Sequence, residues 1–391
     1  MKTIRDLDIT GKRLLLRVDF NVPMDEQGNI TDDIRIRRAL PTIEHALSQG
    51  AKLIICSHMG RPKGQRIAKY SLNPIATHLQ NILSKPVTLA PDCIGEEVET
   101  LTNTMANGDI VLLENLRFHA EETAGDTDFA AQLGKLADTY INDAFAVSHR
   151  AHASVVGVTK HCNECGAGFL LEKEMDYFHR SMNSPARPLV AIVGGAKVSS
   201  KLGALENMLD MVDCMLIGGA MANTFLKSQG VEVGASKIED DLLETARNFL
   251  NKAKEKKIAI HLPLDVTVAD SFSPDAATQL LSVNKIPEGW MALDIGSQTI
   301  ELFKKVINDA KTIVWNGPMG AFEMEAFANG TMTLAHAVAA SEALSITGGG
   351  DSNAAVTQSG VANDISYMST GGGAFLTLME GKELPGVVAL R

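Results

Sequence analysis

The stretch Leu-Val-Ala-Ile-Val-Gly-Gly-Ala-Lys-Val-Ser-Ser-Lys, residues 189–201, carries the pattern that decides the fold. Five consecutive apolar residues end at a glycine pair, and leucines at positions 202, 205 and 209 follow at helical spacing. A short, continuously apolar run is typical of a parallel strand that is buried on both faces. A strand, a glycine-rich turn and a helix in this order predict one unit of an open α/β sheet.

Similar strand–helix units recur on both sides of this stretch. Short apolar runs predict the strands, and the segments between them carry apolar residues at helical spacing. The predicted strands span residues 13–18, 52–56, 110–114, 139–142, 153–158, 189–193, 214–217, 257–261, 291–294, 312–315 and 343–346. Helical spacing is clearest in residues 40–47, 75–83, 202–212 and 242–250. We therefore predict an α/β protein with two Rossmann-like, doubly wound parallel-sheet domains.

A break in the pattern near residues 171–188 predicts the boundary between these domains. Apolar residues at 171, 175, 178 and 182 indicate an amphipathic helix, which the segment Asn-Ser-Pro-Ala-Arg-Pro at 183–188 ends. We expect an N-terminal domain at 1–170, an interdomain helix and hinge at 171–188, a C-terminal domain at 189–375 and a tail at 376–391. A chain of 391 residues has the length of two or three domains.

Composition and charge exclude several classes of function. The chain has 36 Lys and Arg against 47 Asp and Glu, a net charge of −11, which disfavours general binding to nucleic acid or an anionic membrane. No apolar run approaches the length of a membrane span, and the charged N-terminal residues lack the apolar segment of a signal peptide. Five widely spaced cysteines indicate reduced thiols. We expect a cytoplasmic protein without nucleic-acid or membrane partners.

Basic side chains follow the predicted strands of the first half. Ligands of open α/β sheets bind beyond the carboxyl ends of the strands, so these side chains are expected to converge on one edge. Several cations beside groups that bind a hydroxyl describe a pocket for a small phosphorylated hydroxy acid. The hydroxyl-binding candidates are Asp19 and Asn21, and the cationic candidates are Arg35, His58, Arg61, Arg117 and Arg150. Two further residues of this edge, Arg17 and Asp143, are predicted to form a structural ion pair.

Glycine-rich loops follow the predicted strands of the second half, at residues 194–195, 218–219, 317–320, 348–350 and 371–373. Glycine lets backbone amides approach phosphate oxygens closely, and a following helix N-terminus favours the negative charge. Five such loops predict a nucleotide site. Lys197 and Lys201 stand four residues apart beside it, and Asp351 is the candidate Mg²⁺ ligand. Neither the Walker P-loop pattern nor the dinucleotide-binding pattern GxGxxG opens a helix here, which disfavours a P-loop NTPase or a dehydrogenase.

One motif stands apart from both edges. Cys162 and Cys165 form a single CxxC, with His161 adjacent. Zinc sites of this kind need a second ligand pair, and redox sites need a strand–helix context that is missing here. We favour an ordinary loop for this segment over a metal or redox site.

Taken together, the motifs resemble those of the phosphoglycerate kinase family. They occur in the order typical of that family and cover essentially the whole chain. The motifs that carry the resemblance are RVDFNVP (17–23), HMGRP (58–62), ENLRF (114–118), HRAHAS (149–154), GGAKV (194–198), WNGP (315–318) and GGDS (349–352).

The resemblance implies a glycolytic kinase that exchanges a phosphoryl group between ATP and 3-phospho-D-glycerate, with Mg²⁺. Because two substrates on two domains must meet, we predict direct in-line transfer after hinge closure. No interface pattern stands out in the sequence, so we expect a monomer. It implies that the tail folds back onto the N-terminal domain. It implies that the glycerate is held by Asp19, Asn21, Arg35, His58, Arg61, Arg117 and Arg150. For the transferring phosphoryl group it implies Arg35, Lys197, Gly372 and Gly373. For the nucleotide it implies Lys201, Gly219, Asn316, Pro318, Glu323, Gly349, Gly350, Asp351 and Ser352, with Asp351 also binding Mg²⁺.

Two alternative functions stay open on the sequence. The first is a kinase for another small carboxylate, which the hydroxyl-binding pair Asp19 and Asn21 disfavours. The second is a non-catalytic nucleotide-binding protein on the same scaffold, which the loss of Arg35, Lys197 or Asp351 would favour; all three are present.

Overall fold

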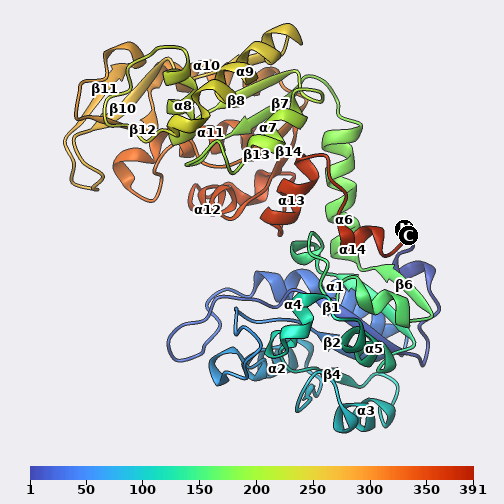
Figure 1. Ribbon diagram of the computed structural model, residues 1–391. Coiled ribbons are helices and arrows are strands. Elements are labelled where there is room, and N and C mark those ends of the chain that lie inside the picture. Colours follow the sequence, from blue (N-terminus) through green and yellow to red (C-terminus); the bar gives the residue numbers. More distant parts are fainter. The chain divides into compact units, whose positions relative to one another are not determined.

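The computed structural model describes residues 1–391, and the chain divides into two compact units. Unit 1 comprises Met1–Met175 and Glu383–Arg391, and unit 2 comprises Asp176–Lys382. Each unit contains a six-stranded parallel sheet accompanied by helices (Figure 1). The predicted α/β class with two doubly wound parallel sheets is therefore confirmed.

The sheet of unit 1 has the strand order β3-β4-β2-β1-β5-β6. Its central strand, β1, is buried from Leu14 to Val18 and pairs in parallel with β2 and β5, as its apolar sequence predicts. The strands are β1 (Arg13–Val18), β2 (Lys52–Cys56), β3 (Thr88–Leu89), β4 (Ile110–Leu112), β5 (Thr139–Asp143) and β6 (Glu164–Ala167). The helices are α1 (Ile34–Ser48), α2 (Asn73–Leu83), α3 (Glu96–Asn103), α4 (Ala120–Ala124), α5 (Thr127–Lys135), α6 (Phe169–Phe178) and α14 (Pro385–Val388).

The sheet of unit 2 has the strand order β15-β14-β13-β7-β8-β9. Its central strands are buried along their whole length, and Trp315 of β13 is the largest fully buried side chain. The strands are β7 (Leu189–Val193), β8 (Cys214–Ile217), β9 (Ala259–His261), β13 (Thr312–Asn316), β14 (Leu344–Thr347) and β15 (Tyr367–Met368). The helices are α7 (Leu202–Met208), α8 (Ala220–Ser228), α9 (Leu243–Glu255), α10 (Ser297–Asp309), α11 (Asn329–Ala340), α12 (Gly350–Gln358) and α13 (Gly372–Met379).

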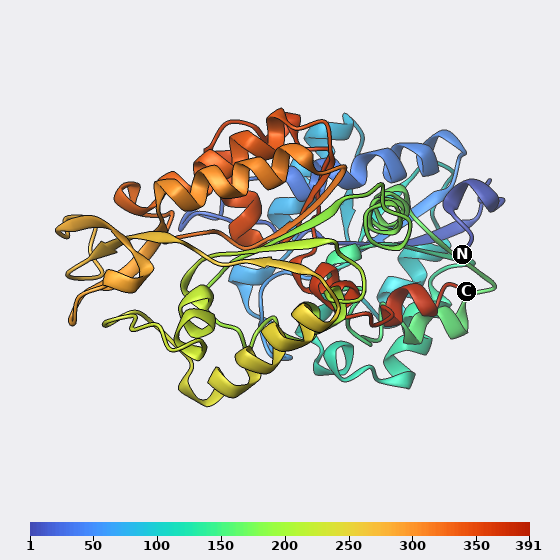
Figure 2. The same cartoon turned by 90° about the horizontal axis from the view of Figure 1, so that it is seen from above.

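A second, smaller sheet extends from one end of unit 2 and was not predicted (Figure 2). Its strands β10 (Asp265–Ala269), β11 (Thr278–Ser282) and β12 (Met291–Ile295) pair antiparallel. The run at 291–294 was predicted as a strand of the parallel sheet, and that placement is wrong. On the other side of β10, strand β11 exposes its first three residues, so it lacks the apolar run that marks a buried strand.

One strand of the first half was also predicted wrongly. Residues 153–158 are apolar, but they form turns that lead into the 3-10 helix η5 (Gly157–His161). This segment packs closely against α5, because a Cβ added to Gly157 would lie 2.7 Å from Cβ of Ala130. The edge strand is instead β6, whose sequence Glu-Cys-Gly-Ala carries little apolar signal.

The segment that joins the two units differs in detail from the expected hinge at 171–188. The boundary between the units falls inside α6, which begins at Phe169 and continues as a single π-helical turn at His179–Asn183. The tail segment divides as well. Helix α13 reaches Met379 within unit 2, whereas residues from Glu383 onward belong to unit 1. The N- and C-termini lie close together in unit 1 (Figures 1 and 2). None of the helices combines the length and apolar character needed to span a membrane.

Candidate functional site

The basic edge of unit 1 is built around Asp19, the first residue after β1. Its side chain is 8% exposed, and its Oδ2 accepts a hydrogen bond at 2.6 Å from Nη1 of Arg35, in the first turn of α1. Its Oδ1 accepts the backbone N–H of Asn21 and lies 3.9 Å from Nδ1 of His58. A single carboxylate thus ties the loop after β1 to α1 and lies beside His58, which follows β2.

Arg17 lies beneath this edge, fully buried, and its predicted ion pair with Asp143 is wrong. Its Nε donates to Oγ of Ser154 at 2.9 Å, and its Nη2 lies 3.2 Å from Nδ1 of His58. The buried carboxylate of Glu122 accepts hydrogen bonds from the same Ser154 and supplies the balancing negative charge.

Asp143 has a different structural role. Its Oδ1 accepts the backbone N–H groups of Leu170 and Leu171 in the first turn of α6, at 2.8 and 3.1 Å. Burial raises the pKa of this carboxyl to about 7. Its hydrogen bonds therefore go to a helix N-terminus rather than to an arginine, because α6 follows β6, the strand that pairs with β5.

Arg117, on the 3-10 helix η3 (Leu116–Phe118), completes the centre of the basic edge. Its Nη1 donates to the carbonyl of Gly60 at 2.8 Å, while Oδ1 of Asn21 accepts the backbone N–H of the same Gly60 at 2.9 Å. Burial, together with the positive charges of Arg17 and Arg150, lowers the pKa of Arg117 to about 10. The guanidinium groups of Arg17, Arg117 and Arg150 therefore lie close enough to repel one another electrostatically.

The histidines of this edge are held neutral for the same reason. Burial first, and then the neighbouring arginines, lowers the pKa of His58 well below its ordinary value and that of His152 to about 4. Three buried nitrogens have no hydrogen-bond partner: Nε of Arg117 and the Nδ1 atoms of His149 and His152. Buried polar atoms are rarely left unpaired, and Nε of Arg117 is a donor, so this excess of positive charge indicates a site for an anion.

The structure therefore brings together Asp19, Asn21, Arg35, His58 and Arg117, with Arg150 near enough to act on Arg117. Arg61 is exposed on the loop after β2 and makes no ion pair. Residues missing from the prediction are Glu122 and Ser154, which hold Arg17. The motif at 149–154 contained Ser154, but nothing in the sequence linked it to position 17.

Lys201 is the best-anchored cation of the glycine-rich edge in unit 2. Its Nζ donates to the carbonyls of Gly194 and Asn316 at 2.6 and 2.8 Å, which ties the end of β7 to the end of β13. Burial lowers the pKa of Lys201 to about 8, and the negative charge of Asp351 acts in the opposite direction. This ammonium group is therefore held at the point where the two central strands end.

The loops after β13 and β14 are joined by side-chain hydrogen bonds. Nδ2 of Asn316 donates to the carbonyl of Gly348 at 2.8 Å, and Oγ of Ser352 accepts the backbone N–H of Gly317 at 2.6 Å. Asn316 and Ser352, both predicted nucleotide-site residues, thus fix the shape of the edge. Pro318 is buried beside them, with its carbonyl against Gly194.

Two helix N-termini meet at this edge. A Cβ added to Gly372, at the start of α13, would lie 2.9 Å from Cα of Gly349, the residue before α12. Gly219 precedes α8 with φ of +67°, and a Cβ there would lie 2.6 Å from the backbone nitrogen of Gly195. Glycine is required at both contacts, and helix N-termini of this kind favour phosphate oxygens.

The remaining predicted residues of unit 2 are exposed. Asp351 opens α12 and has no hydrogen bond to its carboxylate, so its oxygens are available to a hard cation such as Mg²⁺, which prefers oxygen ligands. The structure therefore fits a magnesium ion at this position. Lys197, Glu323, Gly350 and Gly373 are also exposed, and Glu323 makes no ion pair.

Glu239, which was not predicted, anchors the loop that carries Lys197. Its two carboxylate oxygens accept the side-chain O–H of Ser199 at 2.5 Å and the backbone N–H of Ser199 at 3.1 Å. The backbone N–H of Glu239 in turn donates to Thr224 on α8. A lone glutamate forty positions away carries no sequence signal for this contact.

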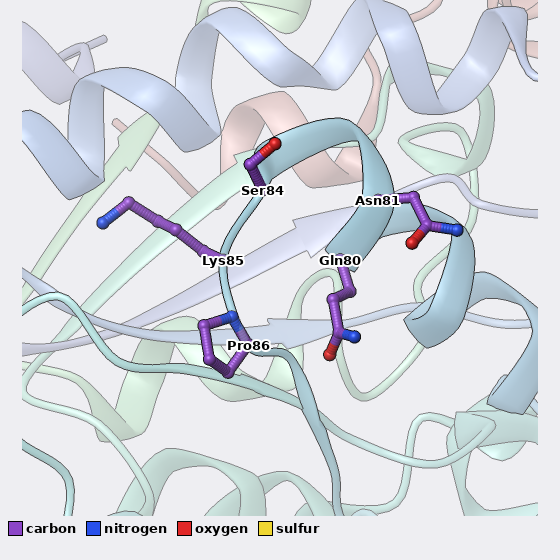
Figure 3. Close-up of a pocket in the computed structure, with 5 residues that line it drawn as sticks. All are labelled: Gln80, Asn81, Ser84, Lys85 and Pro86. Atoms are coloured by element: carbon purple, nitrogen blue, oxygen red, sulfur yellow. The ribbon is translucent and has the colours of Figure 1, made fainter.

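A hollow of about 390 Å³ in unit 1 lies away from these edges (Figure 3). It is lined by Gln80, Asn81, Ser84, Lys85 and Pro86, at and just beyond the end of α2. Figure 3 shows Lys85 directed away from Gln80 and Asn81, so the hollow contains no converging set of charged groups. No predicted site residue lines it.

A basic edge on one α/β unit and a glycine-rich edge on the other are the features expected of a phosphotransferase with two substrates. Comparison with known proteins agrees. The family model described as "Phosphoglycerate kinase" matches residues 4–382. Phosphoglycerate kinase of Desulfotalea psychrophila is 65% identical over 390 residues, covering 100% of both chains, and that of Desulforapulum autotrophicum is 56% identical with the same coverage.

A solved structure gives the same result. Phosphoglycerate kinase from Coxiella burnetii has a TM-score of 0.92 and 42% sequence identity, over 99% of this chain and 98% of that one. The chain belongs to the phosphoglycerate kinase family. Its activity is the glycolytic phosphoryl transfer of that family, with a carboxyl group as acceptor and ATP/ADP as co-substrate. The predicted enzyme class and function are thereby confirmed over the two alternatives.

Proposed function

We propose that the basic edge of unit 1 binds 3-phospho-D-glycerate and that the glycine-rich edge of unit 2 binds the nucleotide. The unpaired Nε of Arg117 carries this proposal, because it is a buried donor among several positive charges and an anionic substrate supplies the oxygen that it lacks. The proposed glycerate ligands are Asp19, Asn21, Arg35, His58, Arg61, Arg117 and Arg150. The proposed nucleotide ligands are Lys201, Gly219, Asn316, Pro318, Glu323, Gly349, Gly350, Asp351 and Ser352.

The transfer proceeds in line between the two substrates. The bond from the γ-phosphorus of ATP to its bridging oxygen breaks, and a bond to a carboxylate oxygen of the glycerate forms. No proton moves, because the attacking carboxylate is already ionised, so no general base is needed. Arg35, Lys197 and the backbone N–H groups of Gly372 and Gly373 stabilise the charge on the transferring group.

Asp351 would hold Mg²⁺ together with the nucleotide phosphates. The ion supplies charge neutralisation on the phosphate oxygens. Lys201, which donates to two backbone carbonyls, lies on the same edge. Its ammonium group would also neutralise negative charge on the nucleotide phosphates.

Substrates held on separate units must be brought together before transfer. We expect closure through the hinge region at 171–188, which would exclude water from the acyl phosphate product. Small-angle scattering tests this: the radius of gyration should fall when both substrates are present. Equal radii with and without substrates would contradict closure.

The assignment of both edges is tested by a coupled assay with Mg-ATP and 3-phosphoglycerate. NADH oxidation by added glyceraldehyde-phosphate dehydrogenase reports the 1,3-bisphosphoglycerate formed. Arg35→Ala and Lys197→Ala should each abolish most turnover in folded protein. Full turnover in either variant would remove that residue from the proposed mechanism. We also propose that the protein is cytoplasmic and monomeric. Sedimentation at several protein concentrations would check the monomeric state.

A further inference from the structure

Three side chains of unit 1 that play no part in the proposed transfer form a separate cluster. Asp92, Cys93 and His119 each offer one metal-ligating atom, and these atoms all lie within 4.8 Å of one another. Nε2 of His119 lies 2.7 Å from Oδ1 of Asp92, and Cys93 is fully buried beside them. The cluster combines an imidazole nitrogen, a carboxylate oxygen and a thiol sulfur.

The backbone fixes two of these residues in place. Asp92 and Cys93 follow β3, and the backbone N–H of Cys93 donates to Oδ1 of Asp92 at 2.7 Å. The carbonyl of Asp92 accepts the backbone N–H of Glu114, which follows β4. The third residue, His119, lies between η3 and α4, two positions after Arg117. The cluster therefore joins the loop after β3 to the segment that carries Arg117.

This set of donors selects a particular class of ion. Nitrogen, sulfur and carboxylate ligands together are those of Zn²⁺ and similar divalent transition metals, whereas Mg²⁺ and Ca²⁺ take oxygen ligands. Three protein ligands leave one tetrahedral position for water. The side chains of His119 and Asp92 are 25% and 33% exposed, which gives an ion access from solvent.

One neighbouring charge opposes a cation. Nη1 of Arg66 lies 3.6 Å from Oδ2 of Asp92. The Arg66 side chain is 57% exposed, and its guanidinium also lies over the ring of Phe118 and donates to the carbonyl of Pro91. Such an exposed side chain can rotate into solvent, so Arg66 should weaken metal binding without preventing it.

We propose that Asp92, Cys93 and His119 bind a divalent transition metal ion of the zinc type, and that the bound ion ties the loop after β3 to the segment carrying Arg117. Binding releases the proton of the Cys93 thiol, since the thiolate is the ligand. The site does not depend on the assignment of either substrate.

Cobalt binding to the full-length, metal-stripped protein tests the site. Co²⁺ should bind in a one-to-one ratio and give a near-ultraviolet thiolate-to-cobalt band, which added Zn²⁺ removes. Cys93→Ser should abolish the band, and Asp92→Asn and His119→Gln should each weaken Zn²⁺ binding by about tenfold or more. Arg66→Gln should strengthen it. Retained kinase activity with Mg-ATP shows that each variant is folded.

The other thiols of the chain supply the matched controls. Cys162→Ser with Cys165→Ser should leave the cobalt band intact, and so should Cys214→Ala. Amide hydrogen exchange in residues 116–120 should slow when Zn²⁺ is added to the wild type but not to Cys93→Ser. A wild type without the thiolate band, or a band lost only with Cys162 and Cys165, would overturn the site. Unchanged exchange on metal binding would overturn the link to the Arg117 segment.

Discussion

Asp19 holds Arg35 through a 2.6 Å hydrogen bond between its Oδ2 and Nη1 of the arginine. The pair connects the end of β1 to the first turn of α1 and leaves the Arg35 side chain 36% exposed at the basic edge. A guanidinium held in this way is positioned before substrate arrives, which reduces the ordering that binding must achieve.

Replacing Arg35 by alanine should therefore lower kcat by about 10²–10³-fold, the range for losing one positioned donor to a developing negative charge. Steady-state assays with varied 3-phosphoglycerate measure kcat for the wild type and the variant. The matched control is Arg37→Ala on the same helix, because Arg37 is exposed and bound to Asp33. An equal loss in both variants would mean that helix stability, rather than the position of Arg35, causes the defect.

Lys201 should make nucleotide affinity depend on alkaline pH. Its pKa in the folded protein is lowered from 10.5 to about 8, so the ammonium form that attracts phosphate is progressively lost above that value. Bound phosphates raise the pKa of Lys201 in the complex, so affinity should begin to fall near pH 8 and should level off only above the higher pKa of the complex. Titration of nucleotide binding from pH 7 to 10 measures this, and Lys201→Arg should flatten the profile. A wild-type profile as flat as that of the arginine variant would contradict it.

The lowered pKa of Lys201 should weaken nucleotide binding at alkaline pH, but it should make the free energy of unfolding rise with pH there. Between about pH 8 and 10.5 the unfolded chain retains the proton of Lys201, whereas the folded protein has lost it. Stability contributed by this site therefore rises with pH in that window. Denaturant unfolding of the wild type and of Lys201→Met should diverge as the pH rises through this range, with the wild type gaining relative to the variant.

The contact between Glu239 and Ser199 should matter for catalysis through the position of Lys197. Glu239→Gln and Ser199→Ala each loosen the loop, and displacement of a catalytic group by about 1 Å can cost up to about 10²-fold in rate. We expect a fall in kcat with a smaller change in KM for ATP. The double variant should be no worse than either single one, because both remove the same contact. Additive losses would show that the two residues act independently.

Glu122 should be more important for stability than for substrate contact. It is fully buried, and it balances Arg17 through Ser154. Glu122→Ala leaves a buried positive charge uncompensated and should lower the free energy of unfolding by about 3–5 kcal/mol. Its exposed neighbour provides the control, since Glu121→Ala should change stability by less than about 0.5 kcal/mol. Urea unfolding of both variants decides between a structural role and a neutral one.

The parallel strands could be predicted from the sequence because burial on both faces leaves a continuous apolar run. Residues 13–18, 52–56, 189–193 and 214–217 were predicted with the bounds that the structure has. Apolar runs fail to predict strands where a buried segment forms no strand, or where a strand is not buried. Residues 153–158 are mostly apolar because the segment is buried without forming a strand, with Gly157 against Ala130 of α5. Conversely, β11 is a strand whose first residues face solvent.

The candidate site was predictable where it follows from strand order, since the carboxyl ends of parallel strands meet at one edge. Asp19, Arg117 and Lys201 were found in this way. The hydrogen-bond partners of these side chains could not be predicted, because they depend on which distant segment of the chain packs beside each strand. Arg17 therefore contacts Ser154 rather than the predicted Asp143, and Glu239 reaches Ser199 across forty positions.

The division of unit 1 between Met1–Met175 and Glu383–Arg391 has a consequence for biosynthesis. Unit 2 is one uninterrupted segment, so a ribosome can complete it while unit 1 still lacks its final piece. That piece is not peripheral: Gly386 donates its N–H to the carbonyl of Ser148, and a Cβ on Gly386 would lie 2.6 Å from Val155. The half of the molecule that is translated first should therefore be the last to reach its finished packing.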